Sequence, residues 1–317
     1  MRKIALEEHF TTPELSRRYV ARPTRSDALF ADIERRLADF DALRLEAMDR
    51  AGIALAVLSV TTPGVQAEKD AATATRLARE ANDVLAAEVA RQPKRYAGFA
   101  HLALQDPAGA ADELERCVRQ LGFRGALING QTNGTYLDAD SCLPFWERVS
   151  ALDVPVYLHP GQMADAPAMF AGRPELDGAV WAWTADTATH ALRLVFGGTF
   201  TRFPNLKVIL GHMGETLPYL LWRLDSRWAC TLGRDLAPEE KPSAIFRRHF
   251  AITTSGVCDP SALADAIAAV GEDAVMFSVD YPYEDTQVAA GFIDTAPMSE
   301  AVRAKMCHAN AERILKL

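Results

Sequence analysis

The chain has 317 residues, of which 49% are hydrophobic and 24% are charged, and its formal net charge is −8. This composition is typical of a folded protein with a sizeable core, which excludes a disordered chain. The negative balance argues against a surface that binds nucleic acid or anionic membranes. A small anionic substrate would therefore need a local cluster of positive charge.

The five cysteines are scattered and never form a CxxC pair, which favours a reducing cytoplasm over a disulfide-linked fold. The first ten residues, MRKIALEEHF, lack the long apolar segment of a signal peptide. No stretch approaches the roughly twenty uncharged apolar residues of a membrane span. We therefore expect a cytoplasmic protein that does not engage a membrane.

Short apolar segments alternate along the chain with longer segments of helical spacing. The strand candidates are residues 3–9, 53–60, 96–104, 125–128, 155–159, 206–212, 250–255 and 275–280. Helical spacing marks residues 31–51, 69–91, 107–121, 145–152, 187–196, 215–230 and, at the end of the chain, 299–317. Eight strands that alternate with helices predict an α/β fold, a distorted (β/α)8 TIM barrel with an extra C-terminal helix.

A doubly wound open sheet is the alternative topology. No glycine-rich phosphate-binding turn follows the first strand, so nothing in the sequence favours this alternative. The chain has no low-complexity linker and no internal repeat, and we expect a single domain over residues 1–317. The longest irregular segments, residues 11–29, 131–143 and 161–180, are candidates for binding loops.

Side chains that can bind a metal fall at the carboxyl ends of the predicted strands. Glu7 and His9 form an E-x-H at the end of the first strand, and residues two apart share one face of a strand. His159, His212 and Asp280 end three later apolar segments. Because TIM-barrel active sites are built at this end of the strands, we expect these side chains to converge around one ion. The other histidines lack the pattern and are predicted to be packing residues: His101, His190, His249 and His308.

The arrangement resembles the decarboxylase branch of the amidohydrolase superfamily. That branch includes γ-resorcylate (2,6-dihydroxybenzoate), 2,3-dihydroxybenzoate, 5-carboxyvanillate and aminocarboxymuconate-semialdehyde decarboxylases. The start A-L-E-E-H-F is similar to the γ-resorcylate type, in which a glutamate replaces the first histidine of H-x-H. Matching stretches run in order along the chain, including T-P-G-V-Q-A at 62–67, G-H-M-G-E at 211–215 and F-S-V-D-Y-P at 277–282.

The resemblance implies that Glu7, His9, His159 and Asp280 ligate one divalent ion per subunit, with no organic cofactor. Two carboxylates and two imidazoles suit Mn²⁺ or Zn²⁺. The implied activity is the non-oxidative loss of CO2 from a small hydroxy-aromatic carboxylic acid. The metal would chelate the carboxylate and an adjacent oxygen of that substrate.

The same chemistry requires a proton donor, because loss of CO2 from an arene leaves an unstable carbanion unless the ipso carbon is protonated first. We expect Asp280 to deliver this proton, with His212 as the alternative donor. Glu215 follows His212 by three residues, a spacing that places both on one helix face. We expect Glu215 to orient His212 and to set its tautomer.

Candidates for substrate contacts are fewer. Arg223 follows Glu215 by eight residues, about 12 Å along a helix, which is too far to serve the same subunit's ion. In aminocarboxymuconate-semialdehyde decarboxylase the arginine at this spacing reaches in from a neighbouring subunit, which implies a homodimer or homotetramer here. Arg44 is a weaker candidate of the same kind. Trp183 and Phe10 are candidates for the apolar wall around the substrate ring.

Two other functions stay open. A metal-dependent hydrolase of a lactone or related ester would use the same metal, with Asp280 as the base. A non-catalytic barrel that binds an aromatic ligand is disfavoured, because buried carboxylates are costly without a cation. Residues 131–143 and 161–180 differ in composition from the corresponding γ-resorcylate enzyme loops, so the sequence does not specify which acid is used.

Overall fold

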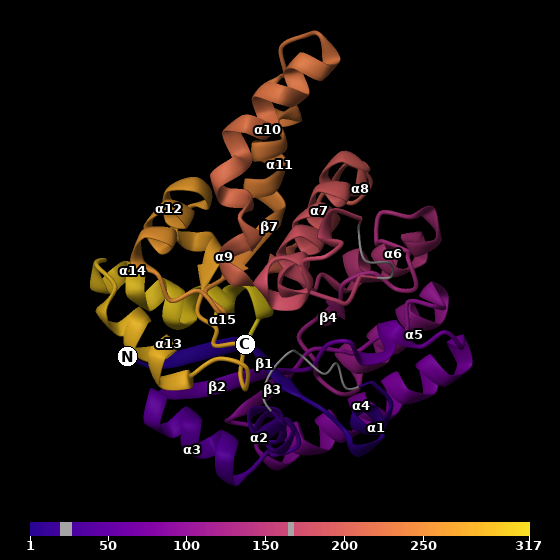
Figure 1. Ribbon diagram of the computed structural model, residues 1–317, viewed down its shortest axis with the longest axis vertical. Helices are drawn as coiled ribbons and strands as arrows, with labels where there is room; N and C mark the ends of the chain where they lie inside the picture. The colour runs from indigo at the N-terminus through magenta and orange to yellow at the C-terminus, as the bar shows by residue number, and fades with distance from the viewer. Residues whose placement is uncertain (20–26, 164–167) are drawn as a thin grey trace.

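The structure is a computed structural model that describes residues 1–19, 27–163 and 168–317. Within these residues eight strands alternate with helices, and every strand pair is parallel. The strands are β1 (Lys3–Phe10), β2 (Ile53–Val60), β3 (Tyr96–Gly98), β4 (Ala126–Asn129), β5 (Val156–His159), β6 (Val208–Leu210), β7 (Phe250–Thr253) and β8 (Val275–Met276). The helices surround the strands, as Figure 1 shows, so the predicted α/β barrel is confirmed.

The barrel is closed at two seams between a sheet of order β1-β2-β3 and a sheet of order β4-β5-β6-β7-β8. At one seam Ala100 pairs with Ala126, and the Leu127 amide donates to the Ala100 carbonyl over 3.1 Å. At the other seam Glu8 pairs with Tyr281, and the His9 amide donates to the Tyr281 carbonyl over 2.7 Å. These isolated bridges replace continuous ladders, which makes the barrel distorted.

Helices follow the strands in chain order. They are α1 (Pro13–Tyr19), α2 (Asp27–Leu37), α3 (Ala42–Ala51), α4 (Ala71–Arg91), α5 (Pro107–Arg119), α6 (Leu143–Leu152), α7 (Ala182–Phe196), α8 (Thr199–Arg202), α9 (His212–Glu215), α10 (Leu217–Leu232), α11 (Pro242–His249), α12 (Pro260–Val270), α13 (Thr286–Thr295), α14 (Glu300–Ala304) and α15 (Asn310–Leu315). Helices α10 and α11 contact each other and project from the barrel at the top of Figure 1. None of the described helices is long and apolar enough to cross a membrane.

The interior of the barrel is filled with apolar side chains. They come from all eight strands and their flanks: Ile4, Leu6, Val57, Ala97, Phe99, Leu127, Tyr157, Ile209, Ala251 and Met276. Ala311 and Leu315 of α15 belong to the same cluster, so the C-terminal helix closes one end of the barrel. Within the barrel, the polar side chains therefore lie at the carboxyl ends of the strands, as in other TIM barrels.

The strands lie where the sequence predicts them, but several end earlier than expected. The predicted strands 96–104, 206–212 and 275–280 end at Gly98, Leu210 and Met276. His212 and Asp280 have positive φ angles of 48° and 77°, a conformation that cannot continue a strand. The polar ends of the predicted strands are therefore turns.

The predicted helix over residues 31–51 is two helices, because α2 ends at Leu37 and α3 begins at Ala42. The side chain of Asp39 accepts from the amide of Arg44 over 3.0 Å, a local hydrogen bond that competes with a continuous helix. Helix α1 lies in a segment expected to be irregular. Residues 20–26 and 164–167 of the predicted loops lie outside the described residues.

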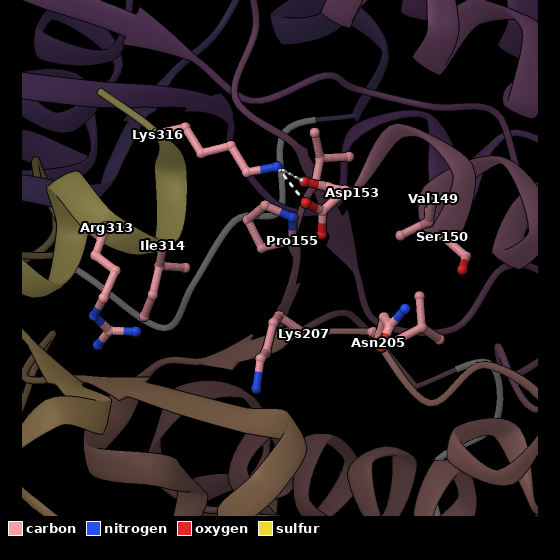
Figure 2. A pocket seen from close by; sticks show the side chains of 11 residues that line it. Val149, Ser150, Asp153, Pro155, Asn205, Lys207, Arg313, Ile314 and Lys316 are labelled. Carbon is pink, nitrogen blue, oxygen red and sulfur yellow. Dashed lines mark hydrogen bonds and ion pairs between the residues drawn. The ribbon is translucent and has the colours of Figure 1, made fainter.

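The amino-terminal ends of the strands carry a cavity of about 150 Å³, shown in Figure 2. Its lining includes Lys207, Arg313 and Lys316. Lys316 pairs with Asp153 over 2.6 Å, whereas Lys207 and Arg313 donate to backbone carbonyls. These positively charged side chains thus have partners within the protein, and they lie at the opposite end of the barrel from the polar strand ends.

Two fully buried histidines bind the loops that follow β2 and β4, which agrees with the packing role predicted for them. Nε2 of His101 accepts from the Val65 amide, and Nε2 of His190 accepts from the Leu137 amide, each over 2.9 Å. Burial lowers the pKa of both imidazoles to about 3. Both are therefore neutral acceptors at neutral pH.

These two histidines predict acid sensitivity. The unfolded chain protonates its histidines below pH about 6.5, whereas His101 and His190 do so in the folded protein only near pH 3. Between these values the unfolded state binds more protons, so the free energy of unfolding should fall by up to about 2.7 kcal/mol per pH unit as pH falls. Denaturant titrations followed by circular dichroism at pH 4.5–7 measure this slope.

The variant His190→Gln serves as the control, because a glutamine oxygen can accept the same amide without titrating. Its slope should be smaller by about 1.4 kcal/mol per pH unit. An unchanged slope would show that His190 is not the buried neutral imidazole described above.

Candidate metal centre

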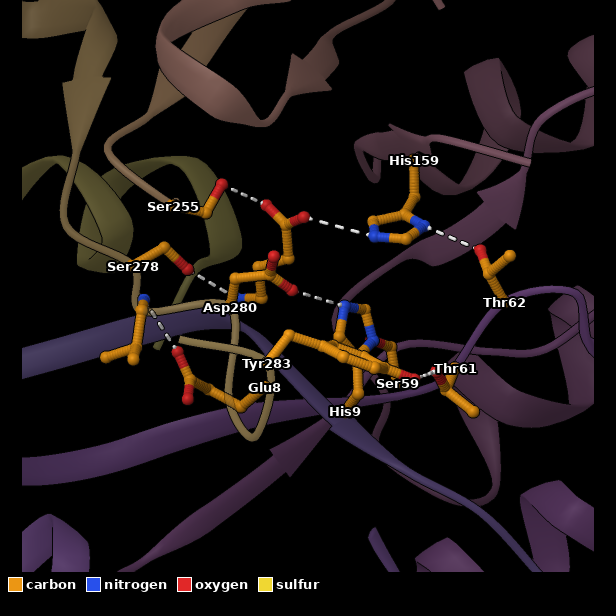
Figure 3. A network of polar contacts seen from close by, with 12 residues as sticks. Glu8, His9, Ser59, Thr61, Thr62, His159, Ser255, Ser278, Asp280 and Tyr283 are labelled. Carbon is orange, nitrogen blue, oxygen red and sulfur yellow. Dashed lines mark hydrogen bonds and ion pairs between the residues drawn. The ribbon is translucent and has the colours of Figure 1, made fainter. Parts of the chain in front are cut away.

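Four acidic and imidazole side chains from distant parts of the chain converge at the carboxyl ends of the strands. Glu7 and His9 lie on β1, His159 ends β5, and Asp280 follows β8. Each offers one ligand atom, and these atoms all lie within 4.8 Å of one another. Figure 3 shows the side chains of His9, His159 and Asp280 directed toward a common point. The convergence predicted from the strand ends is therefore present.

The facing atoms of this group are not satisfied by hydrogen bonds within the described residues. Nε2 of His9 lies 3.3 Å from Oδ1 of Asp280, and Nε2 of His159 lies 3.2 Å from Oε1 of Glu7. Within the described residues, Glu7 Oε1, His9 Nε2 and Asp280 Oδ1 are buried without a hydrogen bond. Buried polar atoms are normally satisfied, and a divalent cation satisfies carboxylate oxygens and imidazole nitrogens together. The residues fit a single metal ion with mixed oxygen and nitrogen ligands.

The charge states of the ligands suit metal binding. Burial alone would raise the pKa of the Glu7 carboxyl, but His212, His159 and His9 together hold it well below its usual value. Burial also raises the pKa of Asp280, and its contacts with the imidazoles of His212 and His9 more than offset this effect. Burial lowers the pKa of His9. Two carboxylates and a neutral imidazole are the forms that bind a cation.

The second oxygen of Glu7 is held by hydroxyl groups. Oε2 accepts hydrogen bonds from Tyr157 and Ser255, and Thr253 lies 3.5 Å away. A Cβ atom on Gly211 would lie 2.6 Å from the same oxygen, so glycine is needed for this close approach. These contacts direct Oε1 toward the ion. Tyr157 was not among the residues predicted from the sequence, although its place two residues before His159 puts both side chains on one face of β5.

The imidazoles of the group also contact hydroxyl groups through their outer nitrogens. Nδ1 of His9 lies 3.2 Å from Ser59 Oγ, and Nδ1 of His159 lies 3.1 Å from Thr62 Oγ1. Ser59 is the register partner of His9 in the β1–β2 pair. The pairing register is a tertiary property, so the contact of Ser59 was not predictable, whereas Thr62 stands in the T-P-G-V-Q-A stretch at 62–67 but was assigned no role there.

His212 is presented by a left-handed turn. His212, Met213, Gly214, Glu215 and Thr216 all have positive φ, from 48° to 81°. Each non-glycine residue in this conformation costs about 1–2 kcal/mol, and such strain is concentrated at functional sites. Nδ1 of His212 lies 2.7 Å from Oε1 of Glu215, so the expected contact is present. The turn brings the two side chains together, whereas the sequence analysis expected a regular helix face.

The other nitrogen of His212 faces the metal ligands. Nε2 lies 3.5 Å from Oε1 of Glu7 and 3.6 Å from Oδ2 of Asp280. Burial lowers the pKa of His212, but the charges of Glu215 and Glu7 raise it well above the usual value. Next to the ligand Asp280 there is thus an imidazole that holds a proton.

Two predicted substrate residues do not reach this group. The side chain of Arg44 is buried behind β1, where it donates to the carbonyls of His9 over 2.6 Å and of Asp39 over 3.0 Å. Its guanidinium lies 4.6 Å from the ring centre of Tyr281. Phe10 is fully buried and packs against Phe40, on the face of β1 opposite to Glu7 and His9. Both support the strand from behind.

Arg223 and Trp183 occupy surface positions. The side chain of Arg223 is exposed on the projecting helix α10, next to Trp222, which is 80% exposed. Trp183 is half-buried in the first turn of α7, and α7 packs against α9, the segment of His212. Trp183 therefore lies on the mouth side of the barrel, and Arg223 is directed away from the core.

Comparisons with known proteins cover the chain almost completely. The family model described as amidohydrolase matches residues 17–317. A γ-resorcylate decarboxylase of Polaromonas sp. strain JS666 is 45% identical, over 99% of this chain and 98% of the relative. A crystal structure of 2,6-dihydroxybenzoate decarboxylase in complex with 2,6-dihydroxybenzoate is 41% identical, with a TM-score of 0.92 over 100% of both chains. A dihydroxybenzoic acid decarboxylase from Polaromonas sp. JS666, with bound manganese and the inhibitor 2-nitroresorcinol, is 43% identical, with a TM-score of 0.91 over 100% of this chain and 97% of that chain.

Proposed function

We propose that this chain, which belongs to the amidohydrolase family, is a metal-dependent decarboxylase of a small hydroxy-aromatic carboxylic acid. The observation that carries the proposal is the buried Glu7, His9, His159 and Asp280 group, with His212 beside it. The relatives act on γ-resorcylate, and one solved relative holds manganese. A 2,6-dihydroxybenzoate-like acid is therefore the first substrate class to test.

The four side chains would hold one divalent ion, and the manganese in the solved relative supports Mn²⁺, with Zn²⁺ as the alternative occupant. When bound, the ion draws electron density from the substrate's carboxylate and adjacent phenol oxygens, and favours the ionised phenol. These substrate oxygens would bind beside the four ligand side chains. No role for an organic cofactor is proposed.

Asp280 and His212 together supply the proton that the reaction needs. Glu215 accepts from Nδ1 of His212, which leaves the second imidazole proton on Nε2, 3.6 Å from Oδ2 of Asp280. Asp280 receives this proton and delivers it to the ipso carbon of the ring. The bond between this carbon and the carboxylate then breaks, its electron pair restores the aromatic ring, and CO2 leaves. The phenol product departs with the added hydrogen.

The contacts to the substrate ring come from the barrel mouth. Trp183 is the candidate for the aromatic wall, because it lies in the first turn of α7, the helix that packs against the His212 turn. Residues 131–143 and the described parts of the segment 161–180 follow β4 and β5 at the same end and would select among hydroxybenzoates. Arg44 and Phe10 would act indirectly, by holding β1 and its two ligands in place.

Arg223 would bind the substrate anion of a neighbouring subunit, in a homodimer or homotetramer. Its support is the exposed apolar surface around it, because Tyr219 and Trp222 are 54% and 80% exposed on the same helix. Exposed aromatic residues of this kind are enriched at protein interfaces.

The cysteines in the structure are unpaired, which supports the expected cytoplasmic location.

A hydrolase of a lactone or ester is the second candidate from the sequence. It would use the same ligands, but the relatives at more than 40% identity are named as decarboxylases. The products distinguish the two reactions, since a hydrolase gives a ring-opened acid and no gas.

The decarboxylase proposal is tested with Mn-loaded protein and a panel of hydroxybenzoates. We expect release of CO2 and a phenol one carboxyl group smaller than the substrate. The variant Asp280→Asn should lower turnover by at least about 100-fold, because the amide cannot pass on a proton. Its thermal transition should stay near that of the native protein. Turnover at the native rate would contradict the assignment of Asp280, and a product without CO2 release would contradict decarboxylation.

The contribution of Arg223 in trans is tested by mixing subunits. Arg223→Ala and Asp280→Asn should each be inactive alone, but a mixed dimer contains one active site with both native residues. After dissociation and reassociation, random pairing should restore about a quarter of the native activity. Arg227→Ala, one turn further along the exposed face of α10, is the matched control and should retain activity. A mixture that stays inactive would contradict the action of Arg223 across the interface.

A further inference from the structure

The hydroxyl group of Thr62 lies behind the metal ligand His159 and contacts three polar atoms. Thr62 lies two residues after the end of β2 and is 7% exposed. Its Oγ1 lies 3.1 Å from Nδ1 of His159, 2.6 Å from the carbonyl oxygen of Pro160 and 3.2 Å from Oδ1 of Asn129. Figure 3 shows Thr62 on the side of the His159 ring opposite to the carboxylates.

The orientation of the Asn129 amide is fixed by its other neighbours. Asn129 pairs with His159 in the register of β4 and β5. Its Nδ2 lies 3.2 Å from the carbonyl of Val60 and 3.3 Å from the carbonyl of Thr61. Carbonyl oxygens only accept hydrogen bonds, so the NH2 group must face them. The side-chain oxygen of Asn129 therefore faces Thr62.

The direction of the hydrogen bond between Thr62 and His159 follows from a count of protons. A hydroxyl group has one hydrogen to donate. The carbonyl of Pro160 and the side-chain oxygen of Asn129 can only accept, so the hydrogen of Thr62 is directed to them. His159 must then be the donor in its contact with Thr62. In the neutral form, which is the form that binds a metal, the hydrogen therefore lies on Nδ1. The lone pair of Nε2 then faces Oε1 of Glu7, 3.2 Å away.

We propose that Thr62 is a positioning residue that holds His159 in the tautomer able to bind the metal through Nε2. In the absence of this hydroxyl group, the carboxylate of Glu7 would favour the other tautomer, because it accepts a hydrogen bond from an Nε2–H group. That tautomer cannot ligate an ion. Ser59 differs from Thr62, because its contact with His9 leaves the direction of the hydrogen bond undetermined. The inference depends on the metal centre and not on the reaction or substrate.

The test compares Thr62→Val with Thr62→Ser. Valine keeps the shape of threonine but lacks the hydroxyl group, whereas serine keeps the hydroxyl group. The dissociation constant for Mn²⁺ is measured by competition with a fluorescent chelator. We expect Thr62→Val to bind Mn²⁺ about 10- to 100-fold more weakly, as is typical for the loss of a partner that orients a ligand. Thr62→Ser should stay within about threefold of the native protein. Thr187→Val is the matched control, because Thr187 is fully buried and its hydroxyl group has no hydrogen bond within the described residues.

A second measurement reads the tautomer directly in the native protein. In ¹⁵N-histidine NMR spectra of the metal-free protein, His159 is assigned by its loss in His159→Gln. We expect the hydrogen on Nδ1 of His159, and a shift toward Nε2 in Thr62→Val. Native Mn²⁺ affinity in a folded Thr62→Val variant, or a hydrogen on Nε2 in the native protein, would overturn the proposal. The spectrum of the native protein decides the question if Thr62→Val does not fold.

Discussion

Two neighbouring carboxylates at the carboxyl ends of the strands, one buried and one largely buried, are the constraint on which the rest of this structure depends. Glu7 and Asp280 lie at the seam where β8 meets β1, and the amide of Asp280 donates to the carbonyl of Glu7 over 3.0 Å. Like charges in a buried site are costly unless a cation balances them. The imidazoles of His9 and His159 complete a set of ligands that one divalent ion satisfies. The contacts that close the barrel are therefore also the contacts that build the metal centre.

The surrounding elements can be understood as means of holding this arrangement in place. Hydroxyl groups of Tyr157 and Ser255 occupy one oxygen of Glu7 and leave the other for the ion. A left-handed turn, with its conformational cost, places His212 against both carboxylates. Below the site, the barrel is filled by apolar side chains, which exclude water from that side of the metal ligands. Electrostatic interactions gain strength in such a site, because the local dielectric constant is low.

The sequence was sufficient to predict the features that depend on local periodicity. Strands β1 and β2, and the E-x-H that places Glu7 and His9 on one face, follow from alternation along a strand. The turns at His212 and Asp280 were not predictable, because their positive φ angles depend on the tertiary packing around them. The break between α2 and α3 depends on one side-chain contact of Asp39. Ser59 was missed because strand register sets which residue lies behind His9, and Thr62 was missed because its contact with His159 depends on how the chain folds beyond β2. Arg44 was predicted as a weaker candidate of the same kind as Arg223, from its place in the sequence, but in the structure its guanidinium group donates to buried carbonyls.

The central claim is that Glu7, His9, His159 and Asp280 share one cation, and anomalous diffraction tests it most directly. Crystals of the Mn²⁺-loaded protein should show one strong anomalous peak per subunit, at about 2.0–2.3 Å from an atom of each of the four side chains. A peak at any other place, with none among these four side chains, would contradict the account. Crystals of the folded protein soaked in Mn²⁺ that show no peak among these four residues would also contradict it.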